Sequence, residues 1–185
     1  MWRSFPRLLN FCSLILLAGC SLLPGSNRPP QREASTNQRT LFAPAASSNA
    51  TCVAGGHPAG ACEGLPLPNA ICRGKGYPAN YCESLSVEEA ICASKGYPKR
   101  HCAGLSLADA ICVSGGHVKG RCAGLEVSDA ICHSAGFPKG YCAGLTVADS
   151  VCVSAGMKKG SCAGLSEGDA LCVSMGYRRG YCEGL

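Results

Sequence analysis

Small and apolar residues recur with a helical period in seven successive segments of the chain, and a polar, glycine-rich stretch follows each segment. The fourth segment has such residues at spacings i, i+3, i+4 and i+7, namely Leu107, Ala110, Ile111 and Ser114. This spacing predicts a short α-helix with one buried face. Gly116 then follows, where it can end the helix in a left-handed conformation. We therefore expect seven short helices, each of about two and a half turns.

These segments belong to a repeat of 20 residues that runs without insertion from residue 46 to residue 185. Its blocks begin at Ala46, Pro66, Ser86, Ser106, Glu126, Thr146 and Ser166, and these residues define block position 1. An unbroken period of this length predicts stacked units, none of which can bury a face alone. We expect a mainly α, disulfide-rich, short-helix solenoid, in which each block is a helix plus a turn or a one-turn helix. A β-solenoid is the alternative, but the segments lack β-branched alternation.

Several positions within a block predict local structure. The pairs Ser86 with Glu89 and Thr146 with Asp149 are spaced as capping boxes. We interpret the whole acidic column at block position 4 as helix capping, namely Glu89, Asp109, Asp129, Asp149 and Asp169. The segment 137–140 fits a type I turn with Pro138 in second place, or a one-turn helix. The leucine that closes every block is expected to seal the core between neighbouring blocks.

The composition indicates how such a chain becomes stable. Among 185 residues there are 16 Cys and 24 Gly, while aromatic residues make up only 6%. Large core-forming side chains are therefore scarce, and a chain of this kind needs covalent staples or stacking. A cysteine content this high is typical of a disulfide scaffold in an exported protein.

Fourteen cysteines fall ten residues apart from Cys52 to Cys182, two in every block. The CxC and CxxC spacings of metal thiolates and redox centres are absent, and the four histidines form no repeated ligand set, so we expect no metal site and no cofactor. Pairing across block boundaries, such as Cys62 with Cys72, would leave Cys52 and Cys182 without partners. Pairing within blocks is therefore favoured, although a ladder between neighbouring blocks stays possible. The favoured pairs are Cys52–Cys62, Cys72–Cys82, Cys92–Cys102, Cys112–Cys122, Cys132–Cys142, Cys152–Cys162 and Cys172–Cys182.

The N-terminal segment has the features of an export signal. Arg3 and Arg7 precede a short apolar run that ends in Leu-Ala-Gly-Cys at residues 17–20, and this run is too short to cross a bilayer. The segment resembles the lipobox of bacterial lipoproteins. That resemblance implies cleavage before Cys20, lipid on its sulfur and its new amino group, and, because Ser21 follows, transport to a Gram-negative outer membrane. Which face of that membrane carries the protein stays open.

The chain thus divides into three parts. Residues 1–19 are the expected signal peptide. Residues 20–45 hold the lipidated Cys20 and a tether rich in Pro, Ser, Asn, Gln and Arg, which is too polar to offset the entropy of ordering. Residues 46–185 are the expected disulfide-stapled repeat domain.

Cations and aromatic residues recur at neighbouring positions of the repeat. Block positions 12, 14 and 16 supply the candidate binding residues Tyr97, Lys99, Lys119, Arg121, Lys139, Tyr141, Lys159, Arg179 and Tyr181. The sequence indicates no local structural role for these cations. Such a ridge suits an extended anionic or sugar polymer, which means peptidoglycan, lipopolysaccharide or an acidic exopolysaccharide, or else an envelope protein. The alternative is a solvated face with aromatic rings packed between turns. Nucleic acid is disfavoured, because residues 46–185 carry 12 Lys and Arg against 11 Asp and Glu.

The expected function is that of a membrane-anchored, non-enzymatic repeat scaffold that binds an envelope polymer or a partner protein. No catalytic triad, HExxH motif or carboxylate pair stands out from the repeat. His101 and His133 depart from the pattern but have no evident partner, so no catalytic residue is expected. A purely structural spacer is the first alternative, and a thiol metal-binding protein is a remote one.

Overall fold

The computed structural model describes residues 46–185. The expectations for residues 1–45, including the signal peptide, the lipidated Cys20 and the tether, lie outside this part of the chain. The described part contains seven α-helices: α1 (Ser48–Ala54), α2 (Leu67–Arg73), α3 (Val87–Ala93), α4 (Leu107–Ser114), α5 (Val127–Ser134), α6 (Val147–Ser154) and α7 (Glu167–Ser174). It has no β-strand, so the mainly α repeat is confirmed and the β-solenoid alternative is wrong. None of its helices has the length and hydropathy needed to cross a membrane.

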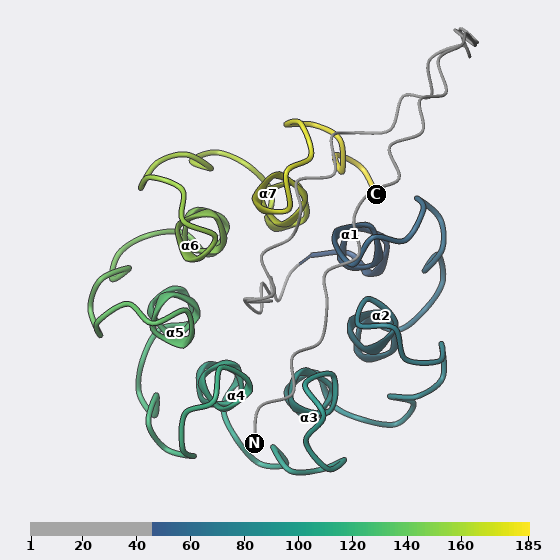
Figure 1. Cartoon of the computed structure of the whole chain (residues 1–185), viewed down its shortest axis with the longest axis horizontal. Helices are drawn as coiled ribbons and strands as arrows, with labels where there is room; N and C mark the ends of the chain where they lie inside the picture. The colour runs from purple at the N-terminus through teal and green to yellow at the C-terminus, as the bar shows by residue number, and fades with distance from the viewer. Residues whose placement is uncertain (1–45) are drawn as a thin grey trace, which may run out of the picture. The chain divides into compact units, whose positions relative to one another are not determined.

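The seven helices form a closed ring. Each helix contacts the next in chain order, and α7 contacts α1 (Figure 1). The segments that link the helices run around the outside of this ring. A plain solenoid would leave its first and last repeats without neighbours. Here the rotation from block to block completes one turn after seven blocks, and the two ends cover each other.

Neighbouring helices run parallel. The sulfur of Cys112 in α4 lies 3.8 Å from the carbonyl oxygen of Ala130 in α5. The same relation, from block position 7 to position 5 of the next block, recurs at 3.7 to 3.9 Å at five other steps. Because the matched residues stay at the same level of each helix, all seven N-termini lie at one end of the ring and all C-termini at the other.

Each helix begins and ends with defined backbone contacts. In α4 the hydroxyl of Ser106 accepts a hydrogen bond from the backbone N–H of Asp109 at 3.2 Å. At the other end, the N–H of His117 donates to the carbonyl of Cys112 at 3.1 Å. Between them Gly116 has φ +92°, a left-handed conformation that glycine adopts without strain. The equivalent glycine has a positive φ in all seven blocks, so the predicted helix ends are confirmed.

The apolar faces of α2 to α7 point toward the inside of the ring. Block position 6 is 0 to 5% exposed in α2 to α7, and these residues form one cluster with position 2: Ile71, Ile91, Ile111, Ile131, Val151 and Leu171, with Leu67, Val87, Leu107, Val127 and Val147. In α4 the side chain at position 4, Asp109, reaches the outer segment of its own block. At 100° per residue, positions 2 and 6 lie on the opposite side of the helix.

Small residues allow the helices to approach closely. A Cβ atom placed on Gly115 would lie 2.8 Å from the Cβ of Ser134 in the next helix. At the closing step, a Cβ atom on Gly168 of α7 would lie 3.0 Å from the Cβ of Ala50 in α1. The closing leucines are partly buried against the clusters between blocks, as expected.

A disulfide joins each helix to the outer segment of its own block. Its two Cα atoms are 6.1 to 6.3 Å apart in every block, and the pairs are Cys52–Cys62, Cys72–Cys82, Cys92–Cys102, Cys112–Cys122, Cys132–Cys142, Cys152–Cys162 and Cys172–Cys182. No pair crosses a block boundary. The outer segment contributes few large apolar side chains, so this covalent link takes the place of a packed core.

Candidate functional site in the outer loops

The outer loops, defined as block positions 12–19, carry the residues that the sequence singles out for binding. Buried carboxylates hold these loops against the helices. Asp109 in α4 is 4% exposed, and its two carboxylate oxygens accept from the N–H of Gly120 at 2.7 Å and of Cys122 at 3.1 Å. Asp129, Asp149 and Asp169 make the same pair of bonds in their own blocks.

The interpretation of the acidic column as helix capping is therefore wrong for the aspartates. The carboxylate of Asp149 bonds to its own outer loop, so the predicted capping box with Thr146 does not form, although the Thr146 hydroxyl accepts from the Asp149 N–H at 3.1 Å. A capping box is present with Ser86 and Glu89, where the longer side chain turns back to the N–H of Ser86 at 2.9 Å.

The cations at block position 14 have a structural role that the sequence does not indicate. Lys119, Lys139 and Lys159 donate to the carbonyl oxygens of His101, Arg121 and Tyr141, at 2.5, 2.5 and 2.6 Å. Arg179 donates to the carbonyl of Ser161 in the same way. Each acceptor lies 18 residues earlier, so each cation ties its own loop to the preceding one. These side chains nevertheless remain exposed.

The aromatic residues pair within single loops. The rings at block positions 12 and 16 stack with centroids 4.4 to 4.9 Å apart, as Tyr77–Tyr81, Tyr97–His101, Phe137–Tyr141 and Tyr177–Tyr181. In the last two pairs the ring at block position 16 is the more accessible one: Tyr141 is 38% exposed and Tyr181 is 46% exposed. Aromatic packing, the alternative to a binding face, is thus part of the loop structure.

Cations and rings also meet between loops. Lys159 Nζ lies 4.1 Å from the ring centroid of Tyr141, and Lys99 Nζ lies 4.4 Å from that of Tyr81. At these distances a cation over a ring face is attracted by the ring quadrupole. The structure therefore brings Lys159 and Tyr141 of the candidate set into contact, while Tyr97 contacts His101 and Tyr181 contacts Tyr177.

The predicted proline turn is displaced by one residue. The carbonyl of Pro138 accepts from the N–H of Tyr141 at 3.1 Å, so the proline is first in the turn rather than second. The third turn residue is then Gly140, with φ +82°, the conformation that type II turns require at that place. Arg100 occupies the equivalent position with φ +65°.

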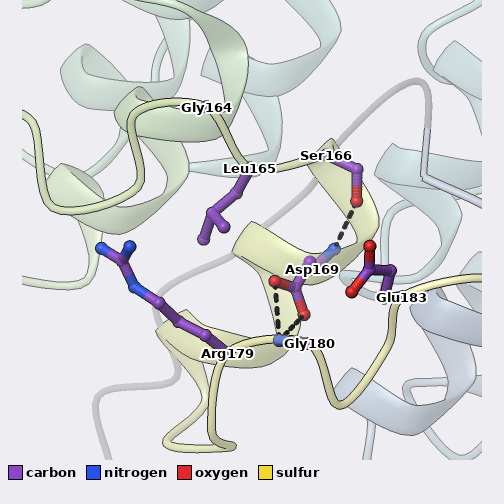
Figure 2. Close-up of a pocket in the computed structure, with 7 residues that line it drawn as sticks. All are labelled: Gly164, Leu165, Ser166, Asp169, Arg179, Gly180 and Glu183. Atoms are coloured by element: carbon purple, nitrogen blue, oxygen red, sulfur yellow. Dashed lines mark hydrogen bonds between the residues drawn. The ribbon is translucent and has the colours of Figure 1, made fainter.

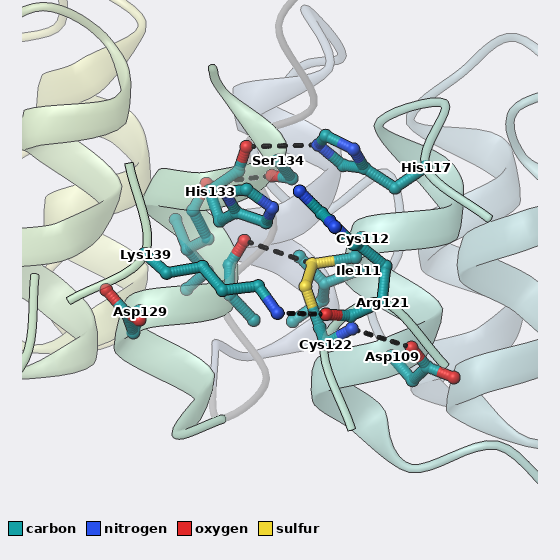
Figure 3. The surroundings of a disulfide bond; sticks show 12 residues. Asp109, Ile111, Cys112, His117, Arg121, Cys122, Asp129, His133, Ser134 and Lys139 are labelled. Atoms are coloured by element: carbon teal, nitrogen blue, oxygen red, sulfur yellow. Dashed lines mark hydrogen bonds between the residues drawn. A yellow bond between two sulfur atoms is a disulfide. The ribbon is translucent and has the colours of Figure 1, made fainter. Parts of the chain in front are cut away.

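Blocks 1, 4 and 6 lack the pair of rings at block positions 12 and 16, and in block 4 the ring at position 12 stacks on the next block. Block position 16 is Arg121, so the ring of His117 stacks instead on His133 of the next block, with centroids 4.6 Å apart and planes 8° apart (Figure 3). His117 Nε2 donates to the carbonyl of His133 at 3.2 Å, and His133 Nδ1 donates to that of Phe137 at 2.9 Å. The buried Nε2 of His133 has no hydrogen-bond partner. The unusual His at position 8 was visible in the sequence, but its stacking partner was not.

A hollow of about 360 Å³ lies between the last two outer loops (Figure 2). Its lining residues are Gly164, Leu165, Ser166, Asp169, Arg179, Gly180 and Glu183. The carboxylate of Asp169 is already bonded to the N–H of Gly180, at 2.9 and 3.0 Å, and Arg179 to the carbonyl of Ser161. The side chains of Asp169 and Arg179 are thus used to hold the loops together.

Two further cations lie at the C-terminal ends of the helices. Partial desolvation lowers the pKa of Lys75, and desolvation together with repulsion from Lys75 lowers the pKa of Lys95.

The cysteines of residues 46–185 are all in disulfides, which leaves no thiolate there to bind a metal. Within the same residues, no group of three or more His, Cys, Asp or Glu is arranged to hold a metal ion. No known protein family, no curated protein and no solved structure matches the chain.

Proposed function

We propose that the chain is a non-enzymatic, lipid-anchored scaffold of the outer membrane, and that its outer loops bind an extended anionic or sugar polymer of the envelope. The observation that carries this proposal is the exposed pair of Lys159 and Tyr141. The ammonium lies 4.1 Å from the ring centroid and is held by the carbonyl of Tyr141 at 2.6 Å. The fixed ammonium of Lys159 can pair with an anionic group, and the exposed ring of Tyr141 beside it can stack on a sugar ring.

The geometry favours affinity in two ways. A disulfide fixes every loop, stacked rings brace the loops of blocks 2, 3, 5 and 7, and aspartate bonds hold those of blocks 4 to 7, so little side-chain entropy is lost when a ligand binds. The cations at block position 14 repeat from loop to loop around the ring, from Lys99 to Arg179. A long polymer can meet several of these cations at once, which raises its apparent affinity without new kinds of contact.

The proposed lipid anchor and the disulfides both support a location outside the cytoplasm. The proposed lipid on Cys20 would hold the protein at the membrane, and seven disulfides persist in an oxidising space outside the cytoplasm. Of the two histidines that depart from the repeat, His101 stacks on the ring of Tyr97, with centroids 4.9 Å apart, and His133 Nδ1 donates to the carbonyl of Phe137 at 2.9 Å. These contacts favour a structural role over a catalytic one.

A purely structural spacer is the second candidate. The observation in its favour is that Lys119, Lys139 and Arg179 each tie two loops together through a backbone carbonyl. Under this reading the cations stabilise the ring and the polymer has no site.

Co-sedimentation of the full chain with purified peptidoglycan sacculi, and binding to an immobilised acidic polysaccharide, separate the two candidates. The test variant combines Lys119→Gln, Lys139→Gln and Lys159→Gln. The control combines Ala103→Glu, Ala123→Glu and Ala163→Glu, which changes the net charge by the same amount at exposed positions that hold Glu in other blocks. We expect the test variant to lose about tenfold or more in affinity, and the control to lose little. Absence of binding to either polymer, or equal losses in both variants, contradicts the proposal.

A further inference from the structure

The charges of the repeat are fully segregated by block position. Within residues 46–185, every Lys and Arg lies between block positions 8 and 16, and every Asp and Glu lies at position 18 or at positions 1 to 4. The two signs therefore occupy different parts of every block. A repeat that only needed solubility would not require this separation, because interspersed charges serve equally well.

Exposed apolar side chains lie in the same range of block positions as the cations. The large hydrophobic residues that remain exposed in the described part of the chain are Val118 (75%), Met175 (51%), Tyr181 (46%), Tyr141 (38%) and Met157 (38%). Every one of them lies between block positions 10 and 16. The acid-bearing positions of the same part of the chain have no such residue. Positive charge and exposed apolar surface thus coincide.

Part of this surface forms one end of the ring, which we call the cationic rim. Block positions 8–13 hold the last turn of each helix and the residues directly after it, and because the helices run parallel these positions share one end. The rim carries the cations Arg73, Lys75, Lys95, Lys158 and Arg178 and the exposed apolar residues Val118, Met157 and Met175. They come from blocks 2, 3, 4, 6 and 7, so they are distributed around the rim rather than gathered in one spot.

We infer that the cationic rim docks on the surface of an anionic phospholipid bilayer. This end of the ring presents cations and methionines from several blocks. A flat partner such as a bilayer surface can contact all of these residues at the same time. Each cation near an anionic surface adds attraction, and flexible methionine side chains can enter the boundary between headgroups and acyl chains. The rim uses block positions 8, 10, 12 and 13, whereas polymer binding uses the cations at position 14. The inference therefore does not depend on the proposed function.

A second ring is a less suitable partner. The opposite end carries acids such as Glu126 and Glu88 and would attract the cationic rim electrostatically. It offers no exposed large hydrophobic residue, within the part of the chain that the structure describes, to cover Val118 or Met175. A bilayer satisfies both the charged and the apolar side chains of the rim.

Vesicle co-sedimentation of the full chain tests the inference. Vesicles of phosphatidylcholine alone are compared with vesicles that also contain phosphatidylglycerol. An acyl anchor inserts into both, so the difference between them isolates the headgroup charge. The rim variant combines Lys75→Gln, Lys158→Gln and Arg178→Gln, and the control is the Ala103→Glu, Ala123→Glu, Ala163→Glu protein with the same net charge.

We expect the full chain to prefer the anionic vesicles and to lose that preference at high salt. The rim variant should lose on the order of 100-fold in its affinity for anionic vesicles, and the control less than about tenfold.

A tryptophan introduced as Met175→Trp should shift its emission to the blue on anionic vesicles, and one introduced as Ala123→Trp should not. Equal binding to both vesicle types, equal losses in the rim variant and the control, or ring-to-ring association without lipid that the rim variant abolishes, would each overturn the inference. Binding to sacculi is measured separately, so either proposal can fail alone.

Discussion

The hydroxyl of Tyr177 in the last block donates to the carbonyl of Val53 in the first, at 3.4 Å and 124 residues away in the chain. The same step occurs inside the ring, where the ring nitrogens of His57 and His117 contact the carbonyls of the residues 16 positions further on. In each case the side chain at block position 12 reaches position 8 of the following block. The interface that closes the ring therefore repeats the interfaces inside it. Block 7 contacts block 1 in the same way that other blocks contact the next block in the chain.

Left-handed residues that are not glycine should limit stability. Arg100 has φ +65° at block position 15, where five of the seven blocks have glycine, and this conformation costs a residue with a Cβ atom about 1 to 2 kcal/mol. We expect Arg100→Gly to raise the free energy of unfolding by about 1 kcal/mol, measured by chemical denaturation. Gly120→Arg is the reverse control, since a Cβ atom there meets nothing within 4 Å and only the backbone conformation opposes it. An unchanged or lower stability of Arg100→Gly would contradict a left-handed conformation at residue 100.

The aspartate at block position 4 should be essential to its loop. Asp129→Ala removes the acceptor of two backbone N–H groups, those of Gly140 and Cys142, and leaves them without partners. We expect a loss of about 2 to 4 kcal/mol, and a smaller loss for Asp129→Asn, which keeps one acceptor oxygen as Asn49 does toward Cys62 at 3.2 Å. Thermal unfolding measures both.

Glu89→Ala serves as the comparison for this prediction. It removes an exposed capping contact and should cost about 0.5 to 1 kcal/mol. If Asp129→Ala costs no more than Glu89→Ala, the carboxylate does not hold the loop.

The staples should be independent of one another. Peptide mapping without reductant should recover only pairs within blocks. The double variant Cys112→Ala, Cys122→Ala should lose about 2 to 3 kcal/mol, the value expected for closing a loop of this length, with the other six bridges intact. A dominant peptide linking Cys62 to Cys72 would refute the connectivity.

Alkaline pH should stabilise the ring through Lys75. Its pKa in the folded protein is lowered from 10.5, so between the folded and unfolded values the unfolded chain binds more protons. Stability therefore rises with pH through that window and is lowest below it, where the ammonium is charged in both states. Lys75→Gln should reduce this rise in a series of unfolding curves, whereas Lys119→Gln in an outer loop should keep it. A rise of the same size in both variants would exclude Lys75 as its source.

Local structure was predictable from the sequence because the information lies within one block. The apolar spacing around Ile111 and the glycine at 116 indicate a helix and its end, and the even count of cysteines favours pairs such as Cys112 with Cys122. Contacts between blocks were not predictable in the same way. The bond from Lys139 to the carbonyl of Arg121 depends on where a backbone lies 18 residues earlier, which no side-chain pattern records.

Closure of the ring was also beyond the sequence. It depends on the rotation between neighbouring helices, which must add up to one full turn over seven steps. Close packing at residues such as Gly115 and Gly168 contributes to that rotation, but no single residue specifies it. A repeat of the same pattern with a different rotation would form an open solenoid.

Closure is the central claim, and distances between spin labels test it most directly. Genetically encoded labels, which avoid free cysteines, are placed in pairs at the equivalent positions Pro58, Val118, Lys158 and Arg178, and double electron–electron resonance gives the separations. In a closed ring the distance from 58 to 178 equals that between the neighbouring blocks 158 and 178, and is shorter than the distance from 58 to 118. A distance from 58 to 178 that exceeds the distance from 58 to 118 would show an open array and contradict the account.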